Sequence, residues 1–259
     1  MANEIVKIHN DLTNEKLGKM NAKELDLFMC ICHKMKDKGI NDVVITFDEL
    51  RKLGNYKSNS NKVLKQDIIK ANSKLLEFQF LIEKGPKTYQ RTLFKNFITD
   101  EEECTVTVSV WEETAYILND IASHFTRFEL SEFVSLDSKY AKRLYKLIKQ
   151  YRMQGKFYIS KDDFYKALDV PANYTNTNYQ KKVLKPALDE CKKYVPSLEC
   201  IPRKSGRGRA VQGYNFTFSP EAEHKPKAKQ KNSKKDNSFN GFEQTTIDFE
   251  NLESSILSN

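Results

Sequence analysis

The chain has 259 residues, of which 39% are hydrophobic and 30% are charged, and its formal net charge is +8. This length suits one large domain or two domains of about 100 residues each. The sequence contains no apolar run of about 18 residues, which excludes a membrane-spanning helix, and its first residues lack the apolar core of a signal peptide. We therefore expect a cytoplasmic protein that does not contact a membrane.

The first half of the chain predicts helix, short strand, short helix, long helix and β-hairpin, in that order. Residues 21–36 predict a helix, with Asn21 as the cap and Glu24 at the capping-box position. Residues 43–47 predict a strand, and 48–54 a short helix. A long helix and strands over 78–85, 88–100 and 104–110 follow, with a turn at Gly85. The inward residues of the two longer helices are Leu25, Phe28, Cys32 and Met35, and Leu64, Ile68, Ala71 and Leu75.

The same order returns in the second half. Residues 137–155 predict a helix, 156–159 a strand, 160–170 a short helix capped by Ser160, and 176–194 a longer helix. Residues 197–218 predict a hairpin, in which Ile201 and the arm over 211–218 anchor a glycine-rich, basic tip. The segment from Ile45, ITFDELRKLG, aligns with ISKDDFYKAL from Ile159, which supports an internal repeat.

This order is typical of winged-helix domains, in which a β-hairpin wing follows a helix-turn-helix. We therefore predict an α+β fold of two tandem winged-helix domains related as an internal repeat. The first domain covers residues 1–124 and the second covers 125–219. Residues 220–259 contain six lysines over 225–235 and no Lys or Arg afterwards, and we expect a disordered tail. Its late apolar cluster is either a partner-docking segment or a helix that packs back on the body.

The cysteines and histidines give no pattern of a metal site or a disulfide framework. The five cysteines are scattered, and Cys30 and Cys32, beside His33, are two residues apart on a predicted helix and so point to different faces. We expect buried free thiols there rather than metal ligands.

No enzyme motif is present either. The sequence lacks a Walker phosphate loop, a metal-binding histidine pair and a nucleophile elbow. The acidic pair Asp162 and Asp163 is better explained as helix capping than as a metal site. We therefore expect a binding protein that is not an enzyme and has no cofactor.

The distribution of charge favours nucleic acid as the partner. Residues 1–124 hold 18 Lys and Arg against 19 Asp and Glu, a net of −1, whereas residues 138–215 hold 18 against 6, a net of +12. A basic half of this kind predicts a polyanion partner, and the alternative is a lysine-rich surface that only confers solubility.

The second domain is the candidate for the principal DNA reader. In a helix-turn-helix the second helix enters the major groove, where Asn and Gln suit adenine edges and Lys suits guanine or phosphate. Pro186 should end or kink this helix, so the part before it is expected to read the groove. The candidate residues of the second helix are Asn176, Asn178, Gln180, Lys181, Lys182 and Lys185, and those of the wing are Arg203, Lys204, Arg207 and Arg209.

The first domain is expected to make only secondary DNA contacts. It has no net positive charge, and we take its hairpin near Gly85 as the non-basic counterpart of the wing in the second domain. An ordinary solvated surface is the alternative for all of these polar residues. The candidate residues of the first domain are Lys57, Asn59, Ser60, Asn61, Lys62 and Lys65.

Several segments resemble the Rep-type, iteron-binding family of plasmid replication initiators. The most specific is SKYAKRLY at 138–145, with Tyr151 and Arg152; MNAKELDLFMCICHKM at 20–35 and VLKPALDE at 183–190, which includes Pro186, are also similar. The resemblance covers roughly residues 5–218.

The resemblance implies an initiator that binds iterons in double-stranded origin DNA as a monomer, helps to open the duplex and recruits host proteins such as the initiator and helicase. It also implies a homodimer, formed through the first domain, that represses the initiator's own gene. Residues 244–249, from Gln244 to Phe249, loosely resemble a sliding-clamp docking motif. The alternatives are a transcriptional repressor without a replication role and a winged-helix protein that never touches DNA.

Overall fold

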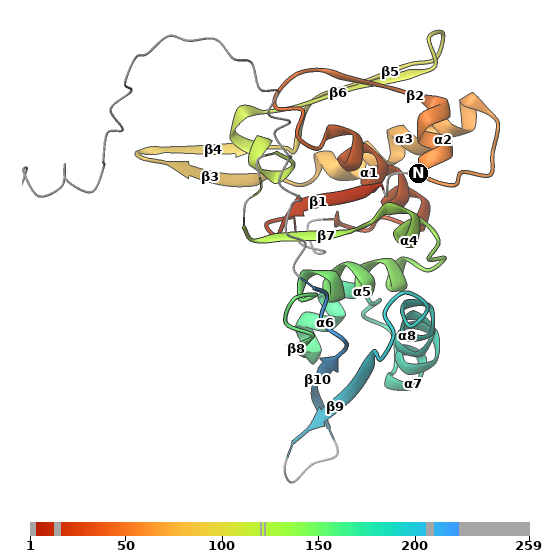
Figure 1. Ribbon diagram of the computed structural model, residues 1–259, viewed down its shortest axis with the longest axis vertical. Helices are drawn as coiled ribbons and strands as arrows, with labels where there is room; N and C mark the ends of the chain where they lie inside the picture. The colour runs from red at the N-terminus through yellow and green to blue at the C-terminus, as the bar shows by residue number, and fades with distance from the viewer. Residues whose placement is uncertain (1–3, 13–16, 120, 122, 206–209, 223–259) are drawn as a thin grey trace, which may run out of the picture. The chain divides into compact units, whose positions relative to one another are not determined.

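The computed structural model describes residues 4–12, 17–119, 121, 123–205 and 210–222 of the chain. Helices and strands follow one another in two similar series, and both series lie in one compact unit, Met1–Glu223 (Figure 1). The predicted α+β class is confirmed. The tail beyond residue 222 and the wing residues Arg207 and Arg209 lie outside the described residues.

The first series is a helix-turn-helix followed by a three-stranded sheet. The Asn21 side chain accepts the Glu24 N–H at 3.0 Å, and the Glu24 carboxylate accepts the Asn21 N–H at 2.7 Å, which confirms the predicted capping box. Thr46 and Glu49 form a second capping box. The elements are α1 (Ala22–Met35), β2 (Val43–Thr46), α2 (Phe47–Leu53), α3 (Asn61–Leu76), β5 (Phe94–Asp100) and β6 (Thr105–Val110).

The wing of the first series differs from the prediction. The sheet order is β2–β6–β5, so the wing is the β5–β6 hairpin, whose turn lies at 101–104. Strands β3 (Phe80–Lys84) and β4 (Lys87–Arg91) form a separate hairpin around Gly85. The expectation that the Gly85 hairpin is the counterpart of the basic wing is therefore wrong. The strand expected over 88–100 is two strands, because the chain leaves one sheet at Arg91 and enters another at Phe94.

The second series repeats the first. Its sheet order is β8–β10–β9, and Ser160 caps its short helix by accepting the N–H of Asp163 at 3.1 Å. Its elements are α5 (Lys139–Gln150), β8 (Lys156–Ser160), α6 (Lys161–Leu168), α7 (Asn176–Tyr179), the π-helical turn η3 (Gln180–Leu184), α8 (Lys185–Cys191), β9 (Glu199–Lys204) and β10 (Val211–Thr217).

The predicted alignment of the two series is confirmed. Ile45 of β2 pairs with Val106 of the central strand β6, and Ile159 of β8 pairs with Tyr214 of the central strand β10. Leu50 and Phe164, which the alignment matches, are both fully buried on the short helix that follows. Capping residues and core residues thus recur at the same places in both copies, as an internal repeat requires.

A third group of elements joins the two series. Strand β1 (Ile5–His9) pairs antiparallel with β7 (Phe125–Glu129), although the two strands are far apart in the sequence. The 3₁₀ helix η2 (Glu112–Ile117) precedes β7, and α4 (Leu130–Val134) follows it. Both β1 and α4 contact α1. The segment after residue 125 therefore packs against elements of the first series as well as the second.

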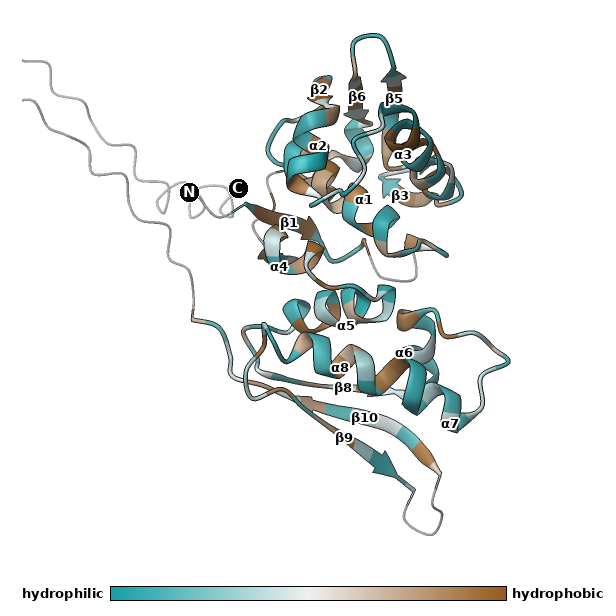
Figure 2. Cartoon of the chain, turned by 90° about the vertical axis from the view of Figure 1, so that its right-hand side faces the viewer, coloured by the Kyte–Doolittle hydropathy of each residue, from teal (hydrophilic) through white to brown (hydrophobic). Residues whose placement is uncertain are grey.

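Helix α1 is buried on more sides than its apolar stripe predicts. Leu27, Met29, Cys30 and Ile31 are buried in addition to the expected stripe, because α3 covers one side of α1 while β1, α4 and α5 cover others (Figure 2). Cys30 and Cys32 are free thiols with no exposed surface, and burial raises the pKa of both.

Candidate nucleic-acid interface

The second helix of the second helix-turn-helix runs without a break from Asn176 to Cys191 through α7, η3 and α8, and we call it the recognition segment. Thr175 caps its start by accepting the N–H of Asn178 at 3.2 Å. Pro186 does not end the segment, and the irregularity expected at the proline takes the form of the π-helical turn η3. The residues that face inward are Tyr179, Val183, Leu184, Ala187 and Cys191, all of them buried.

The polar candidates of this segment lie on its outer side. Asn176 and the three lysines are exposed, while Asn178 and Gln180 are half-buried. Lys182 lies over the ring of Tyr174, 5.9 Å from its centre. Within the described part of the chain, Lys181, Lys182 and Lys185 form no ion pair. These ammonium groups are therefore available to an external anion.

The basic wing is the β9–β10 hairpin of the second series. Arg203 and Lys204 are exposed near its tip, and the Arg203 guanidinium stacks over the Tyr158 ring, 5.4 Å from the ring centre. This contact was not predictable from the sequence, because Tyr158 belongs to β8, which is two strands away from β9 in the sheet. The predicted anchoring role of Ile201 is wrong: its side chain is 54% exposed, because β9 is an edge strand. The arm is held by Tyr214, Phe216 and Phe218, which are buried.

Glycine is necessary at position 213 of the wing because the neighbouring strand β8 lies too close for a side chain. A Cβ atom on Gly213 would lie 2.5 Å from the Ile159 carbonyl oxygen and 2.5 Å from the Tyr158 hydroxyl. Gly213 pairs with Arg203 on one side and Ser160 on the other. The missing side chain therefore lets the Tyr158 ring lie flat across the sheet toward Arg203.

In the first series, internal contacts engage most of the candidate DNA residues. Ser60 caps α3 by accepting the Val63 N–H, and Asn61 accepts from Arg51 and donates to the Cys104 thiol at 2.9 Å. Lys65 forms an ion pair with Glu101 at 2.6 Å. The neighbouring Asn59 carbonyl accepts from Arg51 at 3.2 Å, so Lys57 and Lys62 are left as the exposed cations of the set.

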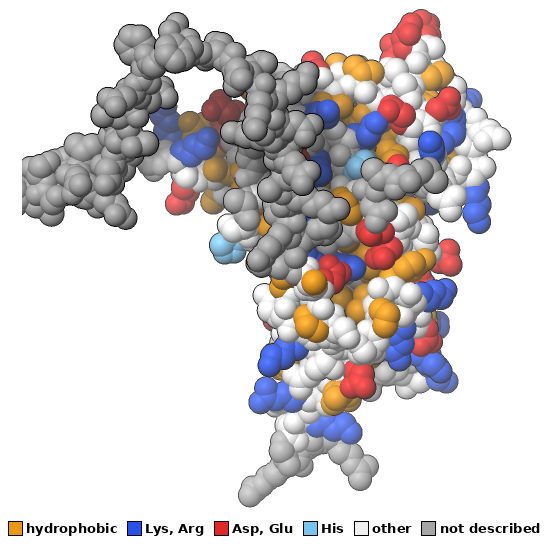
Figure 3. Space-filling model, in the orientation of Figure 1, with side chains coloured by type: hydrophobic (Ala, Val, Ile, Leu, Met, Phe, Trp, Pro, Cys, Tyr) orange, Lys and Arg blue, Asp and Glu red, His pale blue; other side chains and the backbone are white. Residues whose placement is uncertain are grey.

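The wing of the first series is acidic. Its turn carries Glu101, Glu102 and Glu103, and the Asp100 carboxylate accepts the N–H groups of Glu102 and Glu103, each at 2.9 Å. Figure 3 shows these red side chains gathered at the upper tip, whereas blue side chains are spread over the second series. The Lys65 ammonium lowers the pKa of Glu101, which keeps that carboxylate charged. An acidic tip repels phosphate where the second series attracts it.

Part of the basic charge of the second half is buried. On α5, the Lys142 ammonium lies 2.6 Å from the Asp26 carboxylate of α1 and donates to the Phe133 carbonyl at 2.8 Å. Arg143 donates to the Gly18 carbonyl and Lys146 to the Leu12 carbonyl. All three cations are almost completely buried. The net of +12 therefore overstates the charge that an external polyanion meets.

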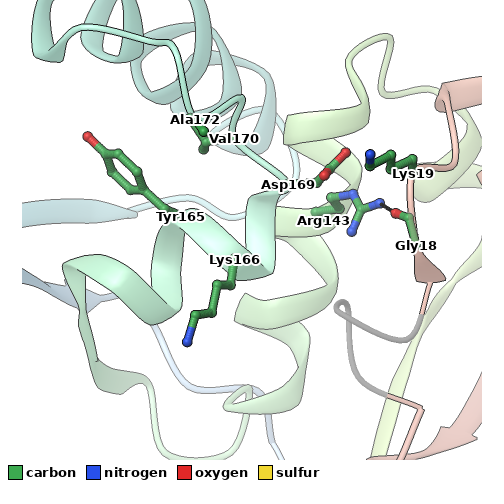
Figure 4. A pocket seen from close by; sticks show the side chains of 8 residues that line it. All are labelled: Gly18, Lys19, Arg143, Tyr165, Lys166, Asp169, Val170 and Ala172. Atoms are coloured by element: carbon green, nitrogen blue, oxygen red, sulfur yellow. Dashed lines mark hydrogen bonds between the residues drawn. The ribbon is translucent and has the colours of Figure 1, made fainter.

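A pocket of about 510 Å³ lies beside this joint (Figure 4). The Arg143 guanidinium points across it to Gly18, and Asp169 pairs with Lys139 at 2.8 Å. Arg143 and Asp169 are therefore engaged with the chain itself, and we assign no ligand to the pocket. It is lined by Gly18, Lys19, Arg143, Tyr165, Lys166, Asp169, Val170 and Ala172.

The described residues contain no group of three or more His, Cys, Asp or Glu side chains placed to hold a metal ion. None of the helices in the described ranges has both the length and the apolar character needed to cross a membrane.

Comparison with known proteins adds three findings. Residues 5–149 match a family model described as initiator replication protein, WH1, and residues 160–218 match one described as initiator Rep protein, WH2. A probable replication protein of Bifidobacterium longum (strain NCC 2705) is 40% identical over 224 residues, which are 85% of this chain and 74% of that protein. The crystal structure of the Pi initiator protein in complex with iteron DNA has a TM-score of 0.68 at 14% identity, covering 86% of this chain and 100% of the other.

Proposed function

The chain belongs to the initiator replication protein family, and from this premise we propose that it starts plasmid replication by binding iterons in the origin. The observation that carries this proposal is the row of exposed, unpaired lysines on the recognition segment, beside a basic wing. The crystallised Pi initiator, which has the same fold, was bound to iteron DNA, and this supports iterons as the DNA class.

In the proposed binding mode the second series reads the DNA sequence. Asn176, Asn178 and Gln180 meet base edges in the major groove, while the lysines of the segment and the wing cations contact phosphate. Lys57 and Lys62 add contacts from the first series. Direct electrostatic attraction favours this division, because the wing of the first series is acidic.

We further propose that the bound protein promotes opening of the adjacent duplex and recruits host replication proteins, including the host initiator and helicase. Residues 244–249 remain a proposal for sliding-clamp docking. The matched family models describe an initiator protein, and we therefore propose a binding role rather than an enzymatic one, exercised in the cytoplasm where plasmid DNA is replicated.

A homodimer in balance with the monomer is also proposed, with the dimer repressing the initiator's own gene. The first series supports this with two exposed apolar side chains on the outer face of its sheet. Val44 and Ile98 are 59% and 58% exposed, and both pair with Thr107 of the central strand. A second copy that covers this row removes apolar surface from water.

The experiment that tests the main proposal is a footprint of the purified full-length protein on the DNA that flanks its gene. Protection of several direct repeats is expected. Protection of a single inverted repeat, with no replication of a plasmid that carries the flanking DNA and the gene, would instead identify a transcriptional repressor. No protection at any site contradicts DNA reading altogether.

A further inference from the structure

The recognition segment changes its helical type halfway along. The N–H of Lys185 donates to the Gln180 carbonyl, five residues earlier, instead of to the carbonyl four residues earlier. A π-helical turn therefore carries one residue more than an α-helical turn. Since one residue of an α-helix corresponds to a rotation of about 100°, side chains before the turn are rotated by that amount relative to an uninterrupted α-helix.

Pro186 accounts for the position of the turn. Proline has no N–H, and in an α-helix its ring presses on the carbonyl four residues earlier, here that of Lys182. The wider turn at Gln180–Leu184 ends two residues before the proline and includes Lys182, on whose carbonyl the proline ring would otherwise press. The helix therefore continues into α8 without a kink that would end the segment.

Tyr179 shows what the extra residue achieves. Its side chain is fully buried, with its ring centre 4.3 Å from that of Tyr165 and 6.2 Å from that of Tyr214. Cys191, fully buried on the same segment, lies twelve positions later. At about 100° per residue an uninterrupted α-helix would place Tyr179 and Cys191 about 120° apart around the helix axis, whereas the extra residue of the π-helical turn brings them to within about 20° of each other.

We propose that Pro186 is a positioning residue for base reading, because the π-helical turn sets the rotation at which Asn176 and Asn178 face the major groove. The inference rests on the proposed DNA-reading function and names the feature that fixes the rotation of the base-reading side chains. Pro186 itself does not contact DNA and acts by setting the helix geometry before it. The groups after the turn, Lys185 and the wing, keep their places because α8 packs on α5, where the Cys191 thiol donates to the Ala141 carbonyl at 3.4 Å. The turn therefore controls sequence preference more than general affinity.

The test uses three full-length proteins: the wild type, Pro186→Ala, and Pro186→Ala with Lys181 deleted. The deletion places Tyr179 and Cys191 eleven residues apart, so a regular α-helix keeps both inward and restores the rotation of Asn176 and Asn178. It removes one proposed phosphate contact and none of the proposed base readers. Each protein selects duplexes from a random-sequence pool, and its affinity for a single unrelated duplex is measured in parallel. Circular dichroism and thermal melting establish that each variant is folded.

The expected result is that Pro186→Ala loses preference by about tenfold or more at one or two base positions. Its affinity for the unrelated duplex should stay within about threefold of the wild type, because Lys185 and the wing keep their places. The deletion variant should select the wild-type motif again. A role in stability alone would lower the affinity for all duplexes by the same factor.

Three results would overturn the inference. The first is a folded Pro186→Ala protein that selects the wild-type motif, and the second is a uniform loss of affinity with an unchanged motif. The third applies if Pro186→Ala does not fold. In that case the inference is overturned when the deletion variant folds but fails to select the wild-type motif. A wild-type protein that selects no motif overturns the proposed function, and the inference with it.

Discussion

Lysine residues have two opposite environments in this chain. Lys181 and Lys182 are exposed on the recognition segment and free of acidic partners among the described residues, so an anion can displace only water from them. Lys142 and Lys146 are buried on α5, where each ammonium is held by a backbone carbonyl. We propose that the first pair serves DNA binding, whereas the second pair orders the joint between the two series.

Lys146 gives a prediction for the pH dependence of stability. Burial lowers its pKa to about 7, and the nearby Arg143 charge acts in the same direction. Between pH 7 and the ordinary lysine pKa near 10.5, the unfolded chain holds a proton that the folded chain lacks. The contribution of Lys146 to the free energy of unfolding therefore rises with pH across this window, and below pH 7 the cost of burying the ammonium is fully present.

The measurement is denaturant unfolding of the wild type and Lys146→Met at pH 6, 7, 8 and 9. The difference between them should change by up to about 1.4 kcal/mol per pH unit above pH 7, with the wild type gaining. Loss of the hydrogen bond to Leu12 shifts the variant by a constant and leaves this slope intact. The opposite pH dependence of Asp26, whose pKa burial raises to about 7, is common to both proteins and cancels in the difference. Parallel profiles would contradict the prediction.

Gly213 gives a prediction about close packing. Its substitution by alanine places a Cβ atom 2.5 Å from the Ile159 carbonyl oxygen, which is backbone and cannot move away freely. The expected loss of stability is about 1–3 kcal/mol, the usual range for overpacking. The matched control is Asn215→Ala, two residues later on the same strand and exposed. Thermal melting of both variants checks the prediction. Equal melting temperatures would show that β8 and β10 can move apart to admit the alanine side chain without loss of stability.

Single residues show which contacts a sequence can predict. Asn21 with Glu24, and Ser160 with Asp163, were predictable because a capping pair lies within three residues and depends only on local geometry. The partner of Lys65, in contrast, is Glu101, which is 36 residues away and meets it only after the wing has folded over α3. The same holds for Arg203 and Tyr158. Candidate DNA residues could be chosen by type, but their internal partners could not.

The two wings are the elements that differ most between the repeats. Both are hairpins whose inner strand is the centre of a three-stranded sheet, but one turn is acidic and the other hairpin carries Arg203 and Lys204. Because interaction with phosphate depends on the sign of charge, equivalent positions in the fold have opposite effects on DNA. The basic wing is therefore expected to supply part of the salt dependence of binding, together with the lysines of the recognition segment.

Changing Arg207 and Arg209 to alanine tests this expectation. If both contact phosphate, the double variant should bind many duplex sequences more weakly, and the slope of log affinity against log salt should fall by about one to two units. The control is Lys84→Ala with Lys87→Ala in the β3–β4 hairpin, which removes the same charge elsewhere. Fluorescence anisotropy at several salt concentrations gives both slopes. An unchanged slope in the arginine variant would refute the wing assignment.

Element order was predictable from the sequence, but sheet membership was not. Hydrophobic periodicity and turn residues placed the helices and most strands, yet Gly85 marks the turn of an additional hairpin and not the wing. The pairing β2–β6–β5 depends on strands far apart in the chain, which local patterns do not encode. Pro186 gave a valid warning of an irregular helix. Its outcome, a π-helical turn, depended on the burial of Tyr179.

At the scale of the whole molecule, the joint between the two series is built from α1, α5 and the β1–β7 pair. Helix α5 belongs to the core of the second series through Ala141, Leu144 and Ile148, and its basic face contacts the first series. The sequence could not show this, because a lysine-rich helix face is usually solvated. The joint thus adds ionic and carbonyl contacts to the apolar packing around α1.

The ion pair between Asp26 and Lys142 carries the last prediction. The Lys142 side chain has no exposed surface and that of Asp26 is 15% exposed, with 2.6 Å between the charged atoms. Removing one partner of such a pair leaves a buried charge without compensation and costs about 3–5 kcal/mol, whereas replacing both by apolar side chains is often neutral or better. Lys142→Met should therefore be strongly destabilised, and Asp26→Leu with Lys142→Met should recover most of the loss.

Denaturant unfolding at pH 7 and pH 5 measures both variants against the wild type. Burial already raises the pKa of Asp26 above its value in the unfolded chain, and loss of the Lys142 ammonium raises it further, so acidification should stabilise the single variant at least as much as the wild type. The double variant has no carboxyl group at this position and should not gain from the same change. A double variant as unstable as Lys142→Met would show that the hydrogen bond from Lys142 to the Phe133 carbonyl, and not the ion pair, holds α5 against the first series.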